Sequence, residues 1–203
     1  IGMSLVFEKN KDVNLIVEQG NSSTKVAVVK DWKVVASFVY RVFNKDVLAS
    51  LFRSYPLDKG IFSTVTAVDE DVVAYLESHL SRFVFFDSQV KLPIAIEYKT
   101  PATLGKDRIA AVVGAYHYQP GRNLLVIDAG TCITYEVVEA AGRYIGGNIS
   151  PGMTTRFKAL EHYTSKLPYV EETDDVPCIG QSTEEAIQAG VVNGIVYEMD
   201  GFI

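Results

Sequence analysis

One short pattern occurs twice in the chain and restricts its possible folds more than any other feature. Residues 17–24 and 127–134 each contain an apolar strand end, an acidic residue, one spacer, a glycine and then a residue with a hydroxyl or amide side chain. In both copies further strand-like segments follow, and then helical patterns. A pattern repeated in this order predicts an α/β unit duplicated within one chain. Two unrelated hairpins that happen to look alike are the alternative.

The rest of the chain alternates between strand-like and helix-like segments. Runs rich in β-branched and aromatic residues predict strands at 14–17, 25–29, 33–40, 60–65, 83–86, 123–127, 133–138 and 143–148. Apolar residues at helical spacing predict helices at 46–55, 69–80, 108–118 and 154–164. A last, long helix is expected after Ser182, where Glu185 stands at the capping-box position that bonds back to Ser182.

Charge and composition exclude several classes of protein. The chain has 19 basic and 25 acidic residues, a formal net charge of −6, and no dense cluster of Lys and Arg. Proteins that bind a phosphate backbone are normally basic on at least one face, so we expect no nucleic-acid partner. No apolar run approaches the roughly 18 residues of a membrane span, so no membrane partner is expected either. The two cysteines, Cys132 and Cys178, lack metal-ligand spacing and fit a reducing cytoplasm.

The repeated hairpin has the residues of a phosphate site. Gly20 and Gly130 permit a tight turn that brings backbone N–H groups close to an anion. The preceding acids, Glu18 and Asp128, can bind Mg²⁺ directly or through water. Two such hairpins facing each other could bind a nucleotide triphosphate from both sides. The alternative is a pair of ordinary β-hairpins, in which glycine and asparagine only satisfy turn geometry.

With these motifs the chain resembles the actin/Hsp70/sugar-kinase superfamily and, within it, the type III pantothenate kinases. The resemblance runs from about residue 14 to the C-terminus. Its five motifs are Glu18-Gln-Gly-Asn-Ser-Ser-Thr-Lys25, Thr100-Pro-Ala-Thr-Leu-Gly-Lys-Asp-Arg108, Asp128-Ala-Gly-Thr-Cys-Ile-Thr134, Gly146-Gly-Asn-Ile-Ser-Pro-Gly152 and Ser182-Thr-Glu-Glu-Ala-Ile187. The resemblance implies an α/β fold of duplicated actin-like (ribonuclease H-like) ATPase domains, with two lobes around a nucleotide cleft.

The resemblance also implies a division of the chain. We expect an N-terminal lobe at 14–118, a C-terminal lobe at 119–203 and a leader or tag-like segment at 1–13. The family normally continues after the long helix with another strand and a glycine-rich turn near the adenine. The second lobe is therefore expected to be truncated.

The same resemblance implies a kinase that phosphorylates pantothenate with ATP, the first step of coenzyme A biosynthesis, and a role for each site residue. The first hairpin would bind ATP through Glu18, Gln19, Gly20, Asn21, Ser22, Ser23, Thr24 and Lys25. Thr131 would contact ATP from the second hairpin, and Asp128 would bind the monovalent cation, K⁺ or NH₄⁺, that the family requires beside Mg²⁺. The pantothenate pocket would contain Tyr98, Gly105, Lys106, Asp107, Arg108 and Thr183. Family members are dimers with this pocket near the subunit boundary, so Thr183 would serve the partner's site.

Asp107 is the candidate catalytic residue. In phosphoryl transfer the protein mainly positions the reactants, and a carboxylate accepts the proton of the attacking alcohol. Asp107 would accept it from the primary hydroxyl of pantothenate. The alternative is that Asp107 caps the helix beginning near Arg108, with Arg108 in solvent. Both roles of Asp107 are compatible.

One residue departs from the family pattern. The first hairpin carries Glu18 where the family has Asp, and the longer side chain could shift a metal ion that requires near-octahedral geometry. This departure motivates a second hypothesis, a non-catalytic regulatory relative that binds pantothenate or nucleotide. A third is a superfamily kinase for another small hydroxylated metabolite.

Overall fold

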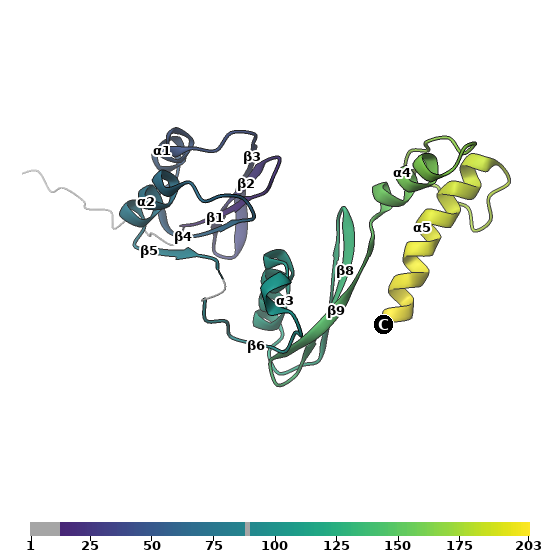
Figure 1. Ribbon diagram of the computed structural model, residues 1–203. Coiled ribbons are helices and arrows are strands. Elements are labelled where there is room, and N and C mark those ends of the chain that lie inside the picture. Colours follow the sequence, from purple (N-terminus) through teal and green to yellow (C-terminus); the bar gives the residue numbers. More distant parts are fainter. Residues whose placement is uncertain (1–12, 88–89) are drawn as a thin grey trace, which may run out of the picture. The chain divides into compact units, whose positions relative to one another are not determined.

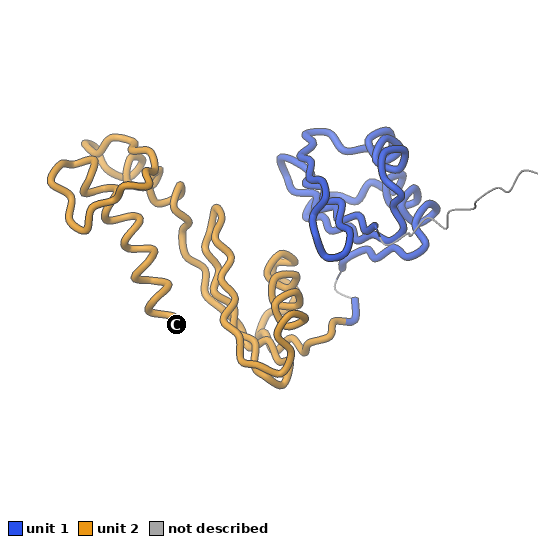
Figure 2. The backbone as a smooth tube through the Cα atoms, turned by 180° about the vertical axis from the view of Figure 1, so that it is seen from behind, with its two compact units in different colours: residues 1–91 blue, residues 92–203 orange. Residues whose placement is uncertain are grey.

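A computed structural model describes residues 13–87 and 90–203, and the chain divides into two compact units, residues 1–91 and 92–203 (Figures 1 and 2). Of the expected leader at 1–13, residues 1–12 lie outside the described part, and Val13 is the first residue of β1. Every expected strand and helix is present, with bounds that differ by about three residues or fewer. In the described part, no helix has both the length and the apolar character needed to span a membrane.

Unit 1 is one mixed sheet with two helices. Its elements are β1 (Val13–Gln19), β2 (Thr24–Lys30), β3 (Lys33–Tyr40), α1 (Lys45–Ser54), β4 (Leu57–Thr64), α2 (Glu70–His79) and β5 (Arg82–Phe85). The strand order is β3-β2-β1-β4-β5, in which β1, β2 and β3 are antiparallel and β4 and β5 are added in parallel. The first three strands, which were expected from the sequence, therefore form an antiparallel meander, and the parallel strands follow through helical crossovers.

The core of unit 1 lies on the helix-covered face of this sheet. Alternate residues of β1 point into it, because side chains along a strand alternate between the two faces, and Leu15 and Val17 are almost fully buried. They pack in one cluster with Leu48 of α1 and with Val72 and Leu76 of α2. Both helices begin at a capping side chain that accepts backbone N–H groups, Asn44 for α1 and Asp69 for α2.

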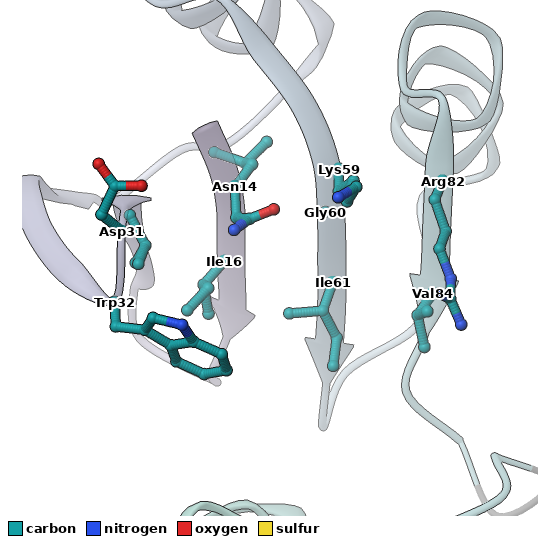
Figure 3. A pocket seen from close by; sticks show the side chains of 11 residues that line it. Asn14, Ile16, Asp31, Trp32, Lys59, Gly60, Ile61, Arg82 and Val84 are labelled. Atoms are coloured by element: carbon teal, nitrogen blue, oxygen red, sulfur yellow. The ribbon is translucent and has the colours of Figure 1, made fainter. Parts of the chain in front are cut away.

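The other face of the same sheet carries a second set of apolar side chains. Ile16 of β1, Ile61 of β4 and Val84 of β5 lie side by side across the strands (Figure 3). With Trp32 they line a hollow of about 550 Å³, and Ile16 and Trp32 are 41% and 73% exposed. Within the described part of unit 1, this face is therefore accessible to solvent.

Unit 2 repeats the meander in a second sheet. Its elements are β6 (Ala95–Ile96), the 3₁₀ turn η1 (Pro101–Thr103), α3 (Lys106–Tyr118), β7 (Leu124–Ala129), β8 (Cys132–Glu139), β9 (Arg143–Pro151), α4 (Met153–Tyr163) and α5 (Thr183–Phe202). The strand order is β6-β9-β8-β7, with β7, β8 and β9 antiparallel and the two-residue β6 parallel to β9. Strands β7–β9 thus repeat the antiparallel arrangement of β1–β3.

Helix α3 belongs to the second unit. We expected the boundary between lobes at 118/119, whereas the compact units divide between residues 91 and 92. The reason is packing, since Val112 of α3 is fully buried in one cluster with Val138 of β8 and Tyr144 of β9. The apolar spacing of α3 predicted a buried helix face, but it did not indicate which sheet covers that face.

Helices α4 and α5 pack on each other through Phe157, Ile187 and Val191. The expected capping box at the start of α5 is present in a modified form. Ser182 Oγ accepts the Glu185 N–H at 3.2 Å, as expected, but Glu185 Oε2 accepts the N–H of Gln181 rather than that of Ser182. Both interactions satisfy N–H groups at the beginning of the helix.

Candidate functional site

The first hairpin is closed by a tight turn between β1 and β2. The Gly20 N–H donates to the Ser23 carbonyl at 2.9 Å, and Gln19 faces Thr24 across the two strands. A Cβ at position 20 would lie 3.3 Å from the Ser23 carbonyl oxygen, so the turn leaves little room for a side chain. Asn21 and Ser22 at its tip are exposed. Their backbone and side-chain donors are therefore accessible to an anion.

Two charged side chains of this hairpin face each other. Glu18 and Lys25 are cross-strand partners, with Glu18 Oε2 3.9 Å from Lys25 Nζ, and their side chains are 55% and 70% exposed. Such an exposed pair contributes little to stability, so both groups can turn toward a bound ion or phosphate at little cost. Next to Glu18, the side-chain oxygen of Gln19 is buried and lacks a hydrogen-bond partner in the described part of the chain.

The second hairpin has the same kind of glycine turn and is also hydrogen-bonded to the beginning of α4. The Gly130 N–H donates to the Cys132 carbonyl at 2.9 Å, while Asp128 and Thr131 are exposed. The Thr131 carbonyl accepts the Gly152 N–H at 2.9 Å and the Thr155 hydroxyl at 2.7 Å. Residues at the beginning of α4 thus fix the turn through its backbone carbonyl, while the Thr131 side chain remains exposed.

In the described part of the chain, the carboxylates of the two hairpins do not belong to a cluster of metal-ligating residues. No group of three or more His, Cys, Asp or Glu residues that could hold a metal occurs within 13–87 and 90–203. Magnesium usually keeps several waters and takes only one or two carboxylates together with substrate phosphates. The single exposed carboxylate in each hairpin, Glu18 or Asp128, therefore fits an ion that arrives with a nucleotide.

The motif at 100–108, called the acceptor segment below, places Asp107 at the beginning of α3. The helix N-cap is Gly105, and the exposed Asp107 at the second helical position accepts the Arg108 N–H on Oδ1 at 2.9 Å. A Cβ at position 105 would overlap that same oxygen, so glycine leaves room for the Asp107 carboxylate. The capping alternative is therefore wrong, because Gly105 is the N-cap and Asp107 lies within the helix, where its carboxylate accepts the N–H of the next residue.

Arg108 lies in a buried hydrogen-bonded network, which contradicts the alternative that left it in solvent. Arg108 is only 7% exposed, and its Nε and Nη2 donate to the two carboxylate oxygens of Glu136 at 2.5 and 2.8 Å. Nη2 also donates to the Tyr144 hydroxyl at 3.0 Å, and that hydroxyl donates to Glu136 Oε2 at 2.6 Å. Glu136 is completely buried. The arrangement is a two-pronged Arg–carboxylate pair with one bridging hydroxyl.

The network shifts the pKa values of Arg108 and Tyr144. Hydrogen bonds to Glu136 raise the pKa of Arg108, and burial followed by the hydrogen bond to Glu136 raises the pKa of Tyr144. Arg108 therefore stays charged and Tyr144 stays protonated throughout the physiological range. Tyr98 belongs to the same group. The centre of its ring lies 5.6 Å from the Arg108 guanidinium carbon and 6.1 Å from the centre of the Tyr144 ring.

Thr183 lies in a different setting. It is the first residue of α5 and lines a groove of about 850 Å³ between α4 and α5, with apolar walls that include Leu160 and Val191. The structure thus brings Tyr98, Asp107 and Arg108 together at the start of α3, and it places Thr183 at the start of α5. The residues of the first hairpin belong to unit 1.

Comparison with known proteins decides the family. The profile of type III pantothenate kinase matches residues 14–203. The chain belongs to the type III pantothenate kinase family. A type III pantothenate kinase of Phocaeicola vulgatus is 45% identical over 191 residues, which cover 94% of this chain and 79% of the relative. One from Porphyromonas gingivalis strain W83 is 44% identical over 193 residues, with the same coverage.

The two sheets confirm the expected α/β fold class. Each unit is built on the same antiparallel meander, which is the duplication that the repeated hairpin predicted. Among solved structures, a Baf family protein from Campylobacter jejuni matches 93% of this chain and 79% of its own, with a TM-score of 0.48 and 21% identity.

Two residues of this kinase's network were missed by the sequence analysis. Glu136 and Tyr144 are distant from Arg108 in sequence, and neither belongs to the hairpin or acceptor patterns. The available signal was an acidic residue within the apolar strand at 133–138, since a charged residue buried in a strand requires a partner.

Proposed function

We propose that this member of the type III pantothenate kinase family transfers the γ-phosphoryl group of ATP to the primary hydroxyl of pantothenate, the first step of coenzyme A biosynthesis. The observation that carries this proposal is the family match over residues 14–203, together with relatives of that name at 45% and 44% identity. The match includes both hairpins and the acceptor segment, which are the parts that this reaction requires.

The phosphates of ATP would be bound by the two hairpins. Each hairpin ends in a tight glycine turn with exposed donors, Asn21 and Ser22 in the first and Thr131 in the second. Glu18 would hold Mg²⁺, directly or through water, and Asp128 would hold K⁺ or NH₄⁺. These cations would neutralise negative charge on the phosphates. Lys25, 3.9 Å from Glu18, would add a positive charge beside the phosphates.

Asp107 would accept the proton from the alcohol. Its carboxylate is exposed, and the hydrogen bond from the Arg108 N–H to Oδ1 orients it at the beginning of α3. The other oxygen, Oδ2, takes no part in that bond and is the atom assigned to the pantothenate hydroxyl. The rest of the pantothenate site would be formed by Tyr98, Gly105, Lys106 and Arg108. In a homodimer, Thr183 would complete the partner's site.

The direct test is a transfer assay. Purified protein is incubated with ATP, Mg²⁺ and pantothenate, with K⁺, NH₄⁺ or Na⁺ as the monovalent cation, and phosphopantothenate is measured by mass spectrometry. We expect product that depends on ATP and increases with K⁺ or NH₄⁺. A panel of other small hydroxylated metabolites should give slower turnover than pantothenate.

Two results would contradict the proposal. A folded protein that binds pantothenate or ATP without forming product would favour the regulatory relative suggested by Glu18. Faster turnover of another metabolite would favour a kinase of different specificity. The cytoplasmic location, the cation requirement and the dimer remain predictions, each open to its own measurement.

A further inference from the structure

We propose that Glu136 is a positioning residue, which holds the Arg108 guanidinium in one orientation so that its remaining edge meets an anionic group of the substrates. This inference rests on the proposed function, in which Arg108 belongs to the pantothenate site. Glu136 contacts Arg108 through both carboxylate oxygens, at 2.5 and 2.8 Å, and is itself completely buried. It therefore acts through Arg108 and does not touch the substrates.

The geometry leaves one part of Arg108 for a ligand. The bonds to Glu136 and Tyr144 use Nε and Nη2. The third nitrogen, Nη1, takes no part in the bonds to Glu136 and Tyr144, and a further hydrogen bond joins the guanidinium to Tyr98, which belongs to the same candidate pocket. An arginine side chain loses rotamer freedom when it is ordered, so a site that fixes it before the ligand arrives lowers the entropy cost of binding. The planar guanidinium can then present Nη1 to an oxyanion in a fixed direction.

The chain makes room for this carboxylate in a way that also explains a motif. Glu136 faces Gly147 across β8 and β9, and a Cβ at position 147 would overlap Glu136 Oε2 and the Tyr135 carbonyl oxygen. The second glycine of the motif at 146–152 is thus required by the Tyr135 backbone carbonyl and the Glu136 side chain together. Buried on all sides, the carboxylate has the Arg108 guanidinium as its counter-charge, so the pair brings no net charge into the interior.

Two anionic groups could meet Arg108, and they predict different kinetics. One is the carboxylate of pantothenate, and the other is the phosphoryl group in transfer. If Arg108 binds the carboxylate, Glu136→Gln should raise the KM for pantothenate about tenfold, equivalent to about 1.4 kcal/mol, with kcat nearly unchanged. If it meets the phosphoryl group, kcat should fall while both KM values stay the same.

The experiment compares Glu136→Gln with Glu139→Gln in the purified enzyme. Glu139 lies on the same strand and pairs with Arg143 at the surface, so it controls for the loss of a carboxylate from β8. The inhibition constant of panthenol, in which a hydroxymethyl group replaces the carboxylate of pantothenate, is measured beside the two KM values. If Arg108 binds the carboxylate of pantothenate, Glu136→Gln should leave the inhibition constant of panthenol unchanged. If Glu136 only supports the fold, Glu136→Gln should weaken the binding of pantothenate and of panthenol equally.

A milder variant keeps the test decisive if Glu136→Gln does not fold. Tyr144→Phe removes only the hydroxyl that bridges Arg108 Nη2 and Glu136 Oε2, and it leaves the ion pair in place. It should give the same selective kinetic change at about threefold. The inference would be overturned if both variants had wild-type kinetics, or if the binding of pantothenate, panthenol and ATP weakened equally. Turnover by the wild-type enzyme would still uphold the proposed function. Absence of turnover in the wild type would overturn the proposed function, and the inference with it.

Discussion

Substituting Gly152 by alanine should weaken both the fold of unit 2 and the binding of ATP. A Cβ at this position would lie 2.7 Å from the Thr131 carbonyl oxygen and would overlap the Gly130 carbonyl oxygen. Both neighbours are backbone atoms, so no side-chain rotation can relieve the overlap. The second hairpin and the start of α4 must therefore move apart, by about 1 Å.

The free-energy cost follows from these contacts. Overpacking of this kind costs about 1–3 kcal/mol. The separation also weakens the bonds to the Thr131 carbonyl from the Gly152 N–H and the Thr155 hydroxyl, each worth about 1 kcal/mol. A total of about 3 kcal/mol corresponds to a fall in Tm of roughly 10 °C in a chain of this size.

The assay is thermal unfolding together with the KM for ATP, because the displaced turn carries Thr131. Gly114→Ala is the matched control, since a Cβ there meets no atom of the described chain within 4 Å and the change should raise Tm slightly. A Gly152→Ala protein with the Tm and the KM for ATP of the wild type would refute this reasoning.

Two further predictions concern the candidate site, and a third concerns Glu198 of α5. Asp107→Asn should lower kcat by at least about 100-fold with Tm nearly unchanged, because the exposed amide oxygen can still accept the same backbone N–H; normal turnover would exclude Asp107 as the base. Glu18→Asp should change the Mg²⁺ concentration that gives half-maximal rate, and an unchanged Mg²⁺ dependence would exclude Glu18 from the metal site. Hydrogen bonds from Ser150 and Arg156 hold the pKa of Glu198 below its ordinary value. Glu198 therefore stabilises the fold above that ordinary pKa, and this stability is lost as pH falls through the lowered one. Between ~pH 6 and ~pH 3, the Tm of the Glu198→Gln variant should fall less than that of the wild type. An equal fall would contradict the stabilising role of the ionised Glu198.

Local signals in the sequence were sufficient for the elements and for the turns that carry the candidate site. The strand expected at 33–40 has those bounds in the structure, because its β-branched and aromatic residues and the polar turn before it identify it without reference to the rest of the fold. The glycine turns at 20 and 130 were likewise predicted from their own residues. Even the imperfect capping box kept its main bond, from the Glu185 N–H to Ser182.

Long-range packing could not be predicted in the same way. Helical spacing showed that α3 has a buried face, but only the contacts of Val112 with the second sheet place it in unit 2. The partner of Arg108 could not be predicted either, because Glu136 is 28 residues away in the sequence and meets Arg108 only through the tertiary packing of the unit. The two-residue strand β6 is held by pairing with β9 and has too little sequence of its own to give a signal.

The most direct test of the central claim is a crystal structure with pantothenate, Mg²⁺ and a non-hydrolysable ATP analogue. It should show donors of both glycine turns, at 20–23 and 130–131, on the phosphates of one nucleotide. The Asp107 carboxylate should then lie within hydrogen-bonding distance of the primary hydroxyl of pantothenate. A nucleotide bound by one turn alone, or a pantothenate hydroxyl beyond the reach of Asp107, would contradict it.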